Sequence, residues 1–232
     1  MNKDSRVEIL NKIKLGLYGD TGHEQGVIST RDAQRDFGKE AKEHERARIN
    51  NQYSLLEQLY QELLDVNAVI FKAAKEENLK ALIFDILRKK SITHYTVWES
   101  DYLNSLGLNG LLKGEGFRRI ISKEKNVIAE AGIGITGADY AIADTGTLVL
   151  LTDENKPRSF SLLPPIHLVI IRRADIVSDI RELFVLLQQR LDAGERPPSC
   201  MTFITGPSRT ADIELNLTLG VHGPKELYVI II

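Results

Sequence analysis

The sequence predicts an α/β protein with a mixed central sheet. Short apolar runs that are typical of buried strands, such as residues 166–171, alternate with segments of helical periodicity. Alternating strands and helices favour parallel strands that are covered by helices. A chain of 232 residues, of which 43% are hydrophobic, is long enough to bury one large core.

Residues 1–49 are predicted to form an N-terminal helical arm. Ser5 and Glu8 have the spacing of a capping box, and apolar residues then recur at helical intervals as far as Leu17. Residues 31–48 carry charge on nearly every side, which is typical of a solvated helix. A dimerisation or docking arm is the alternative. The compact domain is expected over residues 50–232.

The first half of that domain predicts a parallel unit of strand, helix and strand. Apolar residues recur at helical spacing from Tyr53 to Leu63, and residues 67–71 then have the character of a buried strand. A helix follows from Leu79 and ends in the basic residues 88–90, where cations favour the negative end of the helix dipole. Residues 92–98 resemble the next strand.

The second half is richer in strands. Residues 138–152 have β character that is interrupted at Asp144, and further strands are expected at 166–171, 202–204 and 227–232. Apolar residues from Ile176 to Leu191 predict an amphipathic helix that Gly194 closes. We expect residues 137–151 and the three later strands to share one sheet, with this helix packed on it, because strands that are apolar on both faces must be covered.

Residues 132–137 satisfy the pattern GxGxxG, but their context argues against a dinucleotide site. That fingerprint needs a strand before it and a helix after it, so that the pyrophosphate meets the helix N-terminus. Here a segment of helical composition comes first and a strand-like segment follows. The pattern therefore favours a glycine-rich turn from helix to strand.

Composition excludes several classes of protein. The net charge of -2 gives no overall attraction to nucleic acid or to an anionic membrane. Cys200 is the only cysteine, so the chain cannot by itself hold a disulfide or a cysteine-ligated iron–sulfur cluster. No metal-ligand spacing occurs among its histidines, and no metal is expected. The N-terminus lacks an apolar signal region and no apolar run reaches membrane length, which predicts a cytoplasmic protein.

Two strings, GADYAIADTGTLVL and TFITGPSRTADIE, predict a functional site. Each places glycines, hydroxyls and charged groups beside an apolar run, as loops at strand ends do. In the first, Asp144 is a candidate catalytic carboxylate, with Thr145 and Gly146 as binding residues. The same three residues are also typical of a turn between strands, since an Asp side chain can hydrogen-bond to its own backbone and Gly adopts positive φ.

Further candidates follow later in the chain. Arg158, with Ser159, could bind a carboxylate or phosphate in bidentate fashion, or form a surface ion pair. Gly206, Ser208 and Arg209 lie between a strand and a segment of short-helix character, which would suit an anion. His222 precedes the last strand and could act as a general base, although a lone loop histidine is often structural. We expect Asp144, Arg158, Ser208, Arg209 and His222 to converge on one cleft.

From about residue 68 onwards the chain resembles the LutC/YkgG family of lactate-utilisation proteins, also called the LUD domain. The likeness is densest in GADYAIADTGTLVL, RSFSLLPPIHLVIIRRADIV and TFITGPSRTADIELNLTLGVHGP. It implies a three-layer fold related to sugar-phosphate isomerases and CoA transferases, the NagB/RpiA-like superfamily. It also implies a role in oxidising L-lactate to pyruvate, with an iron–sulfur subunit and a cysteine-rich subunit as partners. Iron–sulfur clusters are then expected in those partners, and no cofactor in this chain.

Many family members carry glutamate at the position of Asp144, and in related CoA transferases a glutamate on a comparable turn can be the nucleophile. A misplacement on the order of 1 Å can cost about 100-fold in rate, so the shorter Asp argues against covalent catalysis. Hydrogen bonding or charge stabilisation by Asp144 remains open.

The sequence is compatible with two functions. The first is an accessory subunit of a lactate-oxidising iron–sulfur complex that binds a small anion. The second is a stand-alone enzyme of the isomerase/CoA-transferase type, acting on an acyl, sugar-phosphate or nucleotide substrate. The lack of redox ligands in this chain favours the first.

Overall fold

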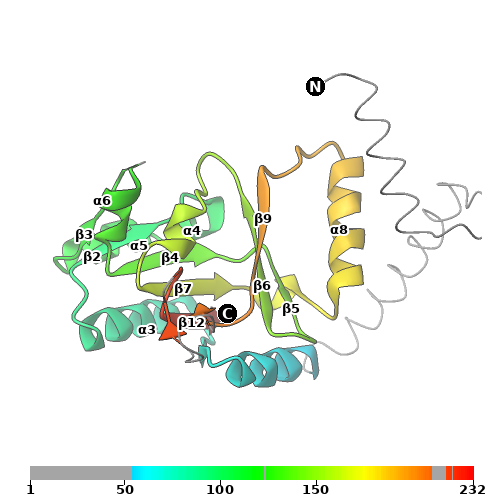
Figure 1. The fold of residues 1–232 in the computed structure, drawn as a ribbon, viewed down its shortest axis with the longest axis horizontal. Helices are drawn as coiled ribbons and strands as arrows, with labels where there is room; N and C mark the ends of the chain where they lie inside the picture. Colours follow the sequence, from blue (N-terminus) through cyan, green and yellow to red (C-terminus); the bar gives the residue numbers. More distant parts are fainter. Residues whose placement is uncertain (1–53, 123, 211–217, 221) are drawn as a thin grey trace, which may run out of the picture. The chain divides into compact units, whose positions relative to one another are not determined.

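The computed structural model describes residues 54–122, 124–210, 218–220 and 222–232, which form two main sheets and a separate two-stranded sheet, with helices around them (Figure 1). The predicted arm, residues 1–49, lies outside the described residues. Within the described part, no helix combines the length and the apolar character that are needed to cross a membrane. The α/β class is confirmed.

The larger sheet contains six parallel strands in the order β1-β12-β7-β4-β2-β3. Every residue of β7 is buried, as expected for a central strand that is covered on both faces. The strands are β1 (Val69–Lys72), β2 (His94–Val97), β3 (Arg118–Arg119), β4 (Ile133–Gly137), β7 (Ile166–Ile171) and β12 (Glu226–Ile231).

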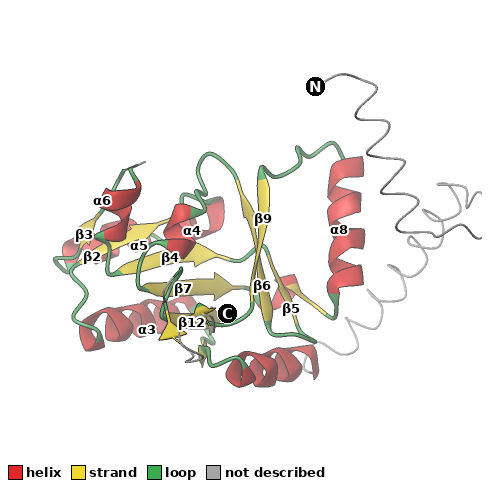
Figure 2. Cartoon of the chain, viewed as in Figure 1, coloured by secondary structure: helices red, strands yellow, loops and turns green. Residues whose placement is uncertain are grey.

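Helices lie on both sides of this sheet (Figure 2), with α3 on one side and α4 and α6 on the other. A further helix over residues 54–65 buries Leu55, Leu56, Leu59 and Leu63 in the main core. The labelled helices here are α3 (Glu76–Lys89), α4 (Asp101–Ser105), α5 (Leu108–Gly114), α6 (Lys125–Ala129) and α7 (Ser159–Leu162).

A second sheet of four strands has the order β8-β5-β6-β9. Strands β5 (Tyr140–Ile142) and β6 (Thr147–Thr152) form an antiparallel hairpin, β9 (Cys200–Ile204) pairs with β6, and β8 (Ile176–Val177) pairs with β5. The prediction that residues 137–151, 166–171, 202–204 and 227–232 share one sheet is therefore wrong. The first and third segments contribute to the smaller sheet, while β7 and β12 belong to the larger one.

The chain changes sheets between two consecutive residues. The backbone N–H of Ala138 donates to Ile170 in the larger sheet at 3.0 Å, and that of Asp139 donates to Val149 in the smaller sheet at 2.9 Å. Buried strands of either sheet have the same apolar pattern, so periodicity alone cannot assign a strand to its sheet.

Helix α8 (Ile180–Asp192) packs on the smaller sheet, where Leu183 joins a buried cluster with Ile142 and Leu151. The predicted helix starts too early, because Ile176 belongs to β8. Asp179 is the N-cap, and its side chain accepts hydrogen bonds from the backbone N–H groups of Arg181 and Glu182.

The apolar stripe predicted for α8 is only partly covered. Ile180, Phe184 and Leu191 are exposed, whereas the prediction packed them on the sheet. The helix therefore leaves an apolar surface open to solvent.

The glycine pattern at 132–137 follows α6, so the predicted order of helix then strand is confirmed, but residues 133–137 form β4 itself and the prediction of a glycine-rich turn is wrong. A Cβ on Gly134 would overlap the backbone carbonyl of Phe160 in α7. Because Gly134 has no side chain, α7 can pack directly against the backbone of β4.

Strand β10 (Arg209–Thr210) pairs antiparallel with β11 (Thr218–Leu219). The short helix expected after Thr210 falls on residues 211–217, which lie outside the described residues, so the helix-terminus interpretation of an anion site here stays a prediction.

Candidate functional site

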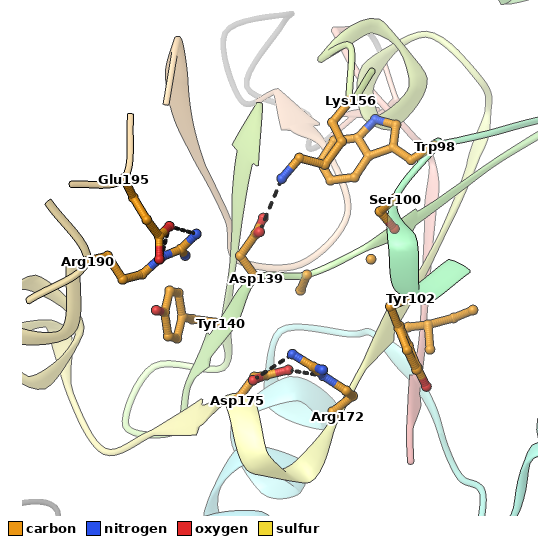
Figure 3. Close-up of a pocket in the computed structure, with 13 residues that line it drawn as sticks. Trp98, Ser100, Tyr102, Asp139, Tyr140, Lys156, Arg172, Asp175, Arg190 and Glu195 are labelled. Carbon is orange, nitrogen blue, oxygen red and sulfur yellow. Dashed lines mark hydrogen bonds and ion pairs between the residues drawn. The ribbon is translucent and has the colours of Figure 1, made fainter. Parts of the chain in front are cut away.

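The carboxyl ends of β2, β4 and β7 surround a cavity of about 350 Å³, which we call the carboxyl-edge cavity (Figure 3). After β2 the chain continues outwards to β3, whereas after β4 it continues towards β7. The cavity therefore lies where the strand order reverses, which is the usual ligand position in open α/β sheets. Its wall includes Trp98 and Ser100 after β2, Gly137 at the end of β4, and Arg172 after β7.

Three ion pairs form most of the polar wall. They come from different parts of the fold, and Figure 3 shows them on three sides of the cavity. In each pair a side-chain nitrogen of the cation lies within 3.2 Å of a carboxylate oxygen. The pairs are Lys156 with Asp139, Arg172 with Asp175, and Arg190 with Glu195.

Arg172 presents the most accessible of these cations. Its Nε and Nη2 donate to the two carboxylate oxygens of Asp175 at 2.6 and 3.1 Å, and this bond is the main cause that raises the pKa of Arg172. The guanidinium lies 5.3 Å from the ring centre of Tyr102. Its Nη1 is not engaged by Asp175, so it can donate to a bound carboxylate while the pair stays intact.

Lys156 and Arg190 are held more tightly. The Lys156 side chain is 17% exposed, and its Nζ lies 3.2 Å from Asp139 and 5.7 Å from the ring centre of Trp98. The Trp98 Nε1 donates to the Pro157 carbonyl at 2.9 Å, which fixes the loop that carries Lys156. The hydrogen bond that Arg190 Nε donates to the Glu195 carboxylate at 2.7 Å is the main cause that raises the pKa of Arg190.

The described lining residues of this cavity include no histidine and no cysteine. The wall therefore offers hydrogen-bond donors and paired charges rather than an imidazole base or a thiol nucleophile.

Three of the predicted site residues meet elsewhere. Gly206, Ser208 and His222 line a cavity of about 230 Å³ beside His167 near the start of β7, which we call the amino-edge cavity. Arg209 does not line it. Its Nη2 donates to the Val66 carbonyl at 2.8 Å, and the residue lines another cavity next to Asn67.

Asp144 and Thr145 are exposed on the turn between β5 and β6 and line none of the four cavities described. Gly146 has φ of 60°, and a Cβ there would lie 2.7 Å from the backbone of Glu62. This geometry agrees with the turn interpretation of the three residues. Their catalytic and binding roles stay predictions.

Arg158 and Ser159 lie at the start of α7, and neither lines any of the four cavities. Arg158 is exposed, with Nη1 4.0 Å from the Cys200 Sγ. Of the five candidate residues that are expected to converge on one cleft, only Ser208 and His222 line the same one of these four cavities.

The site residues predicted from the sequence do not include Lys156, Arg172 and Arg190. Arg172 had a usable signal, because it directly follows the apolar run 166–171, and residues that follow parallel strands gather at one sheet edge. Arg190 had no such signal, since it comes from a helix that packs on the other sheet.

An apolar groove of about 750 Å³ adjoins the carboxyl-edge cavity. Phe184 and Leu191 of α8 and Met201 of β9 contribute to it. Lys156, Arg190 and Glu195 line both spaces. The groove and the cavity are therefore neighbours.

Comparison with known proteins gives concordant matches. The sequence pattern of the LUD domain family matches residues 56–232. The chain is similar to lactate utilization protein C of Halalkalibacterium halodurans, with 36% identity over 169 residues that cover 69% of this chain and 72% of that protein. It is similar to the uncharacterized protein YkgG of Escherichia coli, with 45% identity over 103 residues that cover 44% of this chain and 45% of that protein.

A crystal structure of a DUF162 family protein from Deinococcus radiodurans has a similar fold. Its TM-score is 0.57 at 24% identity, and the match covers 78% of this chain and 97% of that one. This likeness concerns the fold alone. The likeness to sugar-phosphate isomerases and CoA transferases stays a prediction.

Proposed function

We propose a function from one premise: the chain belongs to the LUD domain family. It acts in the utilisation of L-lactate as an accessory subunit, in the cytoplasm, and binds a small carboxylate in the carboxyl-edge cavity. Oxidation of lactate to pyruvate releases two electrons and two protons. Because Cys200 is its only cysteine, the chain cannot by itself ligate an iron–sulfur cluster. Partner subunits that carry such clusters therefore accept the electrons.

The observation that carries the ligand assignment is the position of Arg172. It follows β7 at the point where the strand order reverses, and its Nη1 is not engaged by Asp175. A guanidinium that is already oriented by a carboxylate loses little freedom when it binds a second one. Lactate and pyruvate both carry the carboxylate that this donor recognises.

Arg172→Gln is expected to weaken binding of L-lactate and pyruvate by at least about 10-fold, because a charge-assisted hydrogen bond is worth about 1.5–3 kcal/mol. Calorimetric titration measures the affinity, and lactate oxidation by the reconstituted subunits measures the consequence. Arg173→Gln is the control, since Arg173 is exposed and does not line the cavity. Equal affinities of the two variants for L-lactate and pyruvate would contradict the assignment of the ligand to Arg172. Normal lactate oxidation without this chain would remove the accessory role.

We place the partner contact on the groove between α8 and β9. The groove exposes Phe184, Leu191 and Met201, and grouped exposed apolar side chains are typical of protein interfaces. It is also continuous with the carboxyl-edge cavity through Lys156 and Arg190. A partner seated there brings its iron–sulfur centre close to the bound carboxylate.

Phe184→Gln is expected to reduce co-elution with the iron–sulfur partner by at least about 10-fold, because a central aromatic contact is often worth about 2 kcal/mol. Analytical gel filtration of the mixed subunits measures this. Leu111→Gln, on α5, is a matched control that removes an exposed apolar side chain elsewhere. An equal effect of both variants, or of neither, would contradict the assignment of the groove.

The alternative of a stand-alone isomerase or CoA-transferase type of enzyme requires a reactive carboxylate beside its substrate. Asp144 is exposed and lines none of the four cavities, so no specific observation favours this alternative.

A further inference from the structure

The amino-edge cavity differs in chemistry from the carboxyl-edge cavity. Among the described residues that line it, none is Lys, Arg, Asp or Glu. Its polar groups are hydroxyls, backbone groups and two imidazoles. The cavity also lies at the other end of β7: His167 is the second residue of that strand, whereas Arg172 follows its last residue.

His167 is almost completely buried, with 1% of its surface exposed. Its Nε2 lies 2.8 Å from the Thr136 Oγ1, while Nδ1 has no hydrogen-bond partner among the described residues. Burial lowers the pKa of His167 to about 3, so the ring is neutral at pH 7. A buried polar atom without a partner costs about 1–3 kcal/mol, and native proteins contain few of them.

A second buried atom of this kind belongs to a residue that lines the same cavity. The Thr202 Oγ1 also has no partner among the described residues, and Thr202 belongs to β9 of the smaller sheet. The neighbouring Thr205, by contrast, exchanges a hydrogen bond of 2.8 Å with Thr147. Two unsatisfied polar atoms, one from each sheet, thus belong to side chains that line one cavity.

We propose that the amino-edge cavity binds a small uncharged molecule with hydroxyl, amide or carbonyl groups, and that His167 Nδ1 and Thr202 Oγ1 are its hydrogen-bonding partners. An anion would lose its hydration there without gaining a Lys or Arg partner, which is costly. A hydroxyl or primary amide can both donate and accept, so it suits either tautomer of His167. The volume of about 230 Å³ lies below that of drug-sized pockets and suits a small molecule.

Lactamide and L-lactate are matched probes, since they share a carbon skeleton and differ in charge. Protein labelled with ¹⁵N in its histidines is titrated with each, and the His167 ring signals are followed by NMR. We expect a saturable shift with lactamide and an affinity at least about 10-fold weaker for lactate at this site. The Arg172→Gln variant is expected to bind lactamide as the wild type does, which separates this inference from the proposed function.

Two variants test the assigned partners. His167→Phe retains a ring without nitrogen, and Thr202→Val removes the hydroxyl at nearly constant shape. Each is expected to weaken lactamide binding by at least about 5-fold, in line with the loss of one hydrogen bond. If the His167→Phe variant does not fold, lactamide binding by the Thr202→Val variant tests the proposal by itself. The absence of a saturable shift, a preference for lactate, or unchanged affinity in Thr202→Val would overturn the proposal.

Discussion

Replacing Gly134 by alanine is expected to destabilise the domain by about 3 kcal/mol, at the upper end of overpacking effects. The added Cβ would overlap the carbonyl oxygen of Phe160, and Pro164 closes the site from another side. A backbone carbonyl cannot rotate away as a side chain does. Helix α7 would have to move off the sheet, and it carries Ser161 and Leu162 of the amino-edge cavity.

Urea unfolding measures this loss, and Gly110→Ala is the matched control. Gly110 lies in α5, and nothing lies within 4 Å of a Cβ there. Alanine is the better helix former, so this control is expected to gain about 0.5–1 kcal/mol. Similar free energies of unfolding for the two variants would show that the backbone of α7 does not contact β4 at Gly134.

The stability of the protein is expected to fall by about 2 kcal/mol between pH 7 and pH 5 because of His167 alone. Its pKa in the folded protein is lowered to about 3 from the ordinary value of 6.5. As the pH falls below 6.5, the unfolded chain binds this proton and the folded protein does not. The neutral His167 ring therefore makes its full contribution to the free energy of unfolding above pH 6.5, and this contribution is lost progressively as the pH falls towards 3.

His167→Gln removes this titration while it keeps an amide that can bond Thr136. Urea unfolding at pH 7, 6 and 5 should show a smaller pH dependence in this variant than in the wild type. His222→Gln, which alters an exposed histidine, is the control and should keep the wild-type dependence. A wild-type slope in His167→Gln would mean that burial does not keep this ring neutral. Asp179 and Glu226, whose pKa values are lowered, contribute mainly at more acidic pH.

Much of the local structure could be predicted from the sequence. The apolar run 166–171 is β7, and the interruption at Asp144 is the turn between β5 and β6. The order of helix and strand around Gly134 excluded a dinucleotide fingerprint before any geometry was known. Each of these features depends on neighbours in the chain, which periodicity and turn chemistry describe.

The candidate sites depended on contacts between distant residues. Ser208 and His222 were correctly expected to lie together, because backbone bonds near Pro224 bring their loops into contact. Arg209 comes next to Ser208 in the chain but donates to Val66 instead. Ser208 ends the loop before β10 and Arg209 begins that strand, and the two neighbours line different cavities.

The sequence by itself determined the fold class, most strands and helices, and membership of a family, because these follow from local patterns and from likeness along the chain. Only the tertiary structure decided which sheet each strand joins and which charges surround a cavity. Arg172 follows the parallel strand β7, Lys156 follows β6 of the smaller sheet, and Arg190 belongs to α8, which packs on that smaller sheet. The three line one cavity only through the tertiary packing of these elements. The tertiary structure also buries His167 and leaves its Nδ1 without a partner among the described residues, a property that arises from its three-dimensional surroundings and not from its neighbours in sequence.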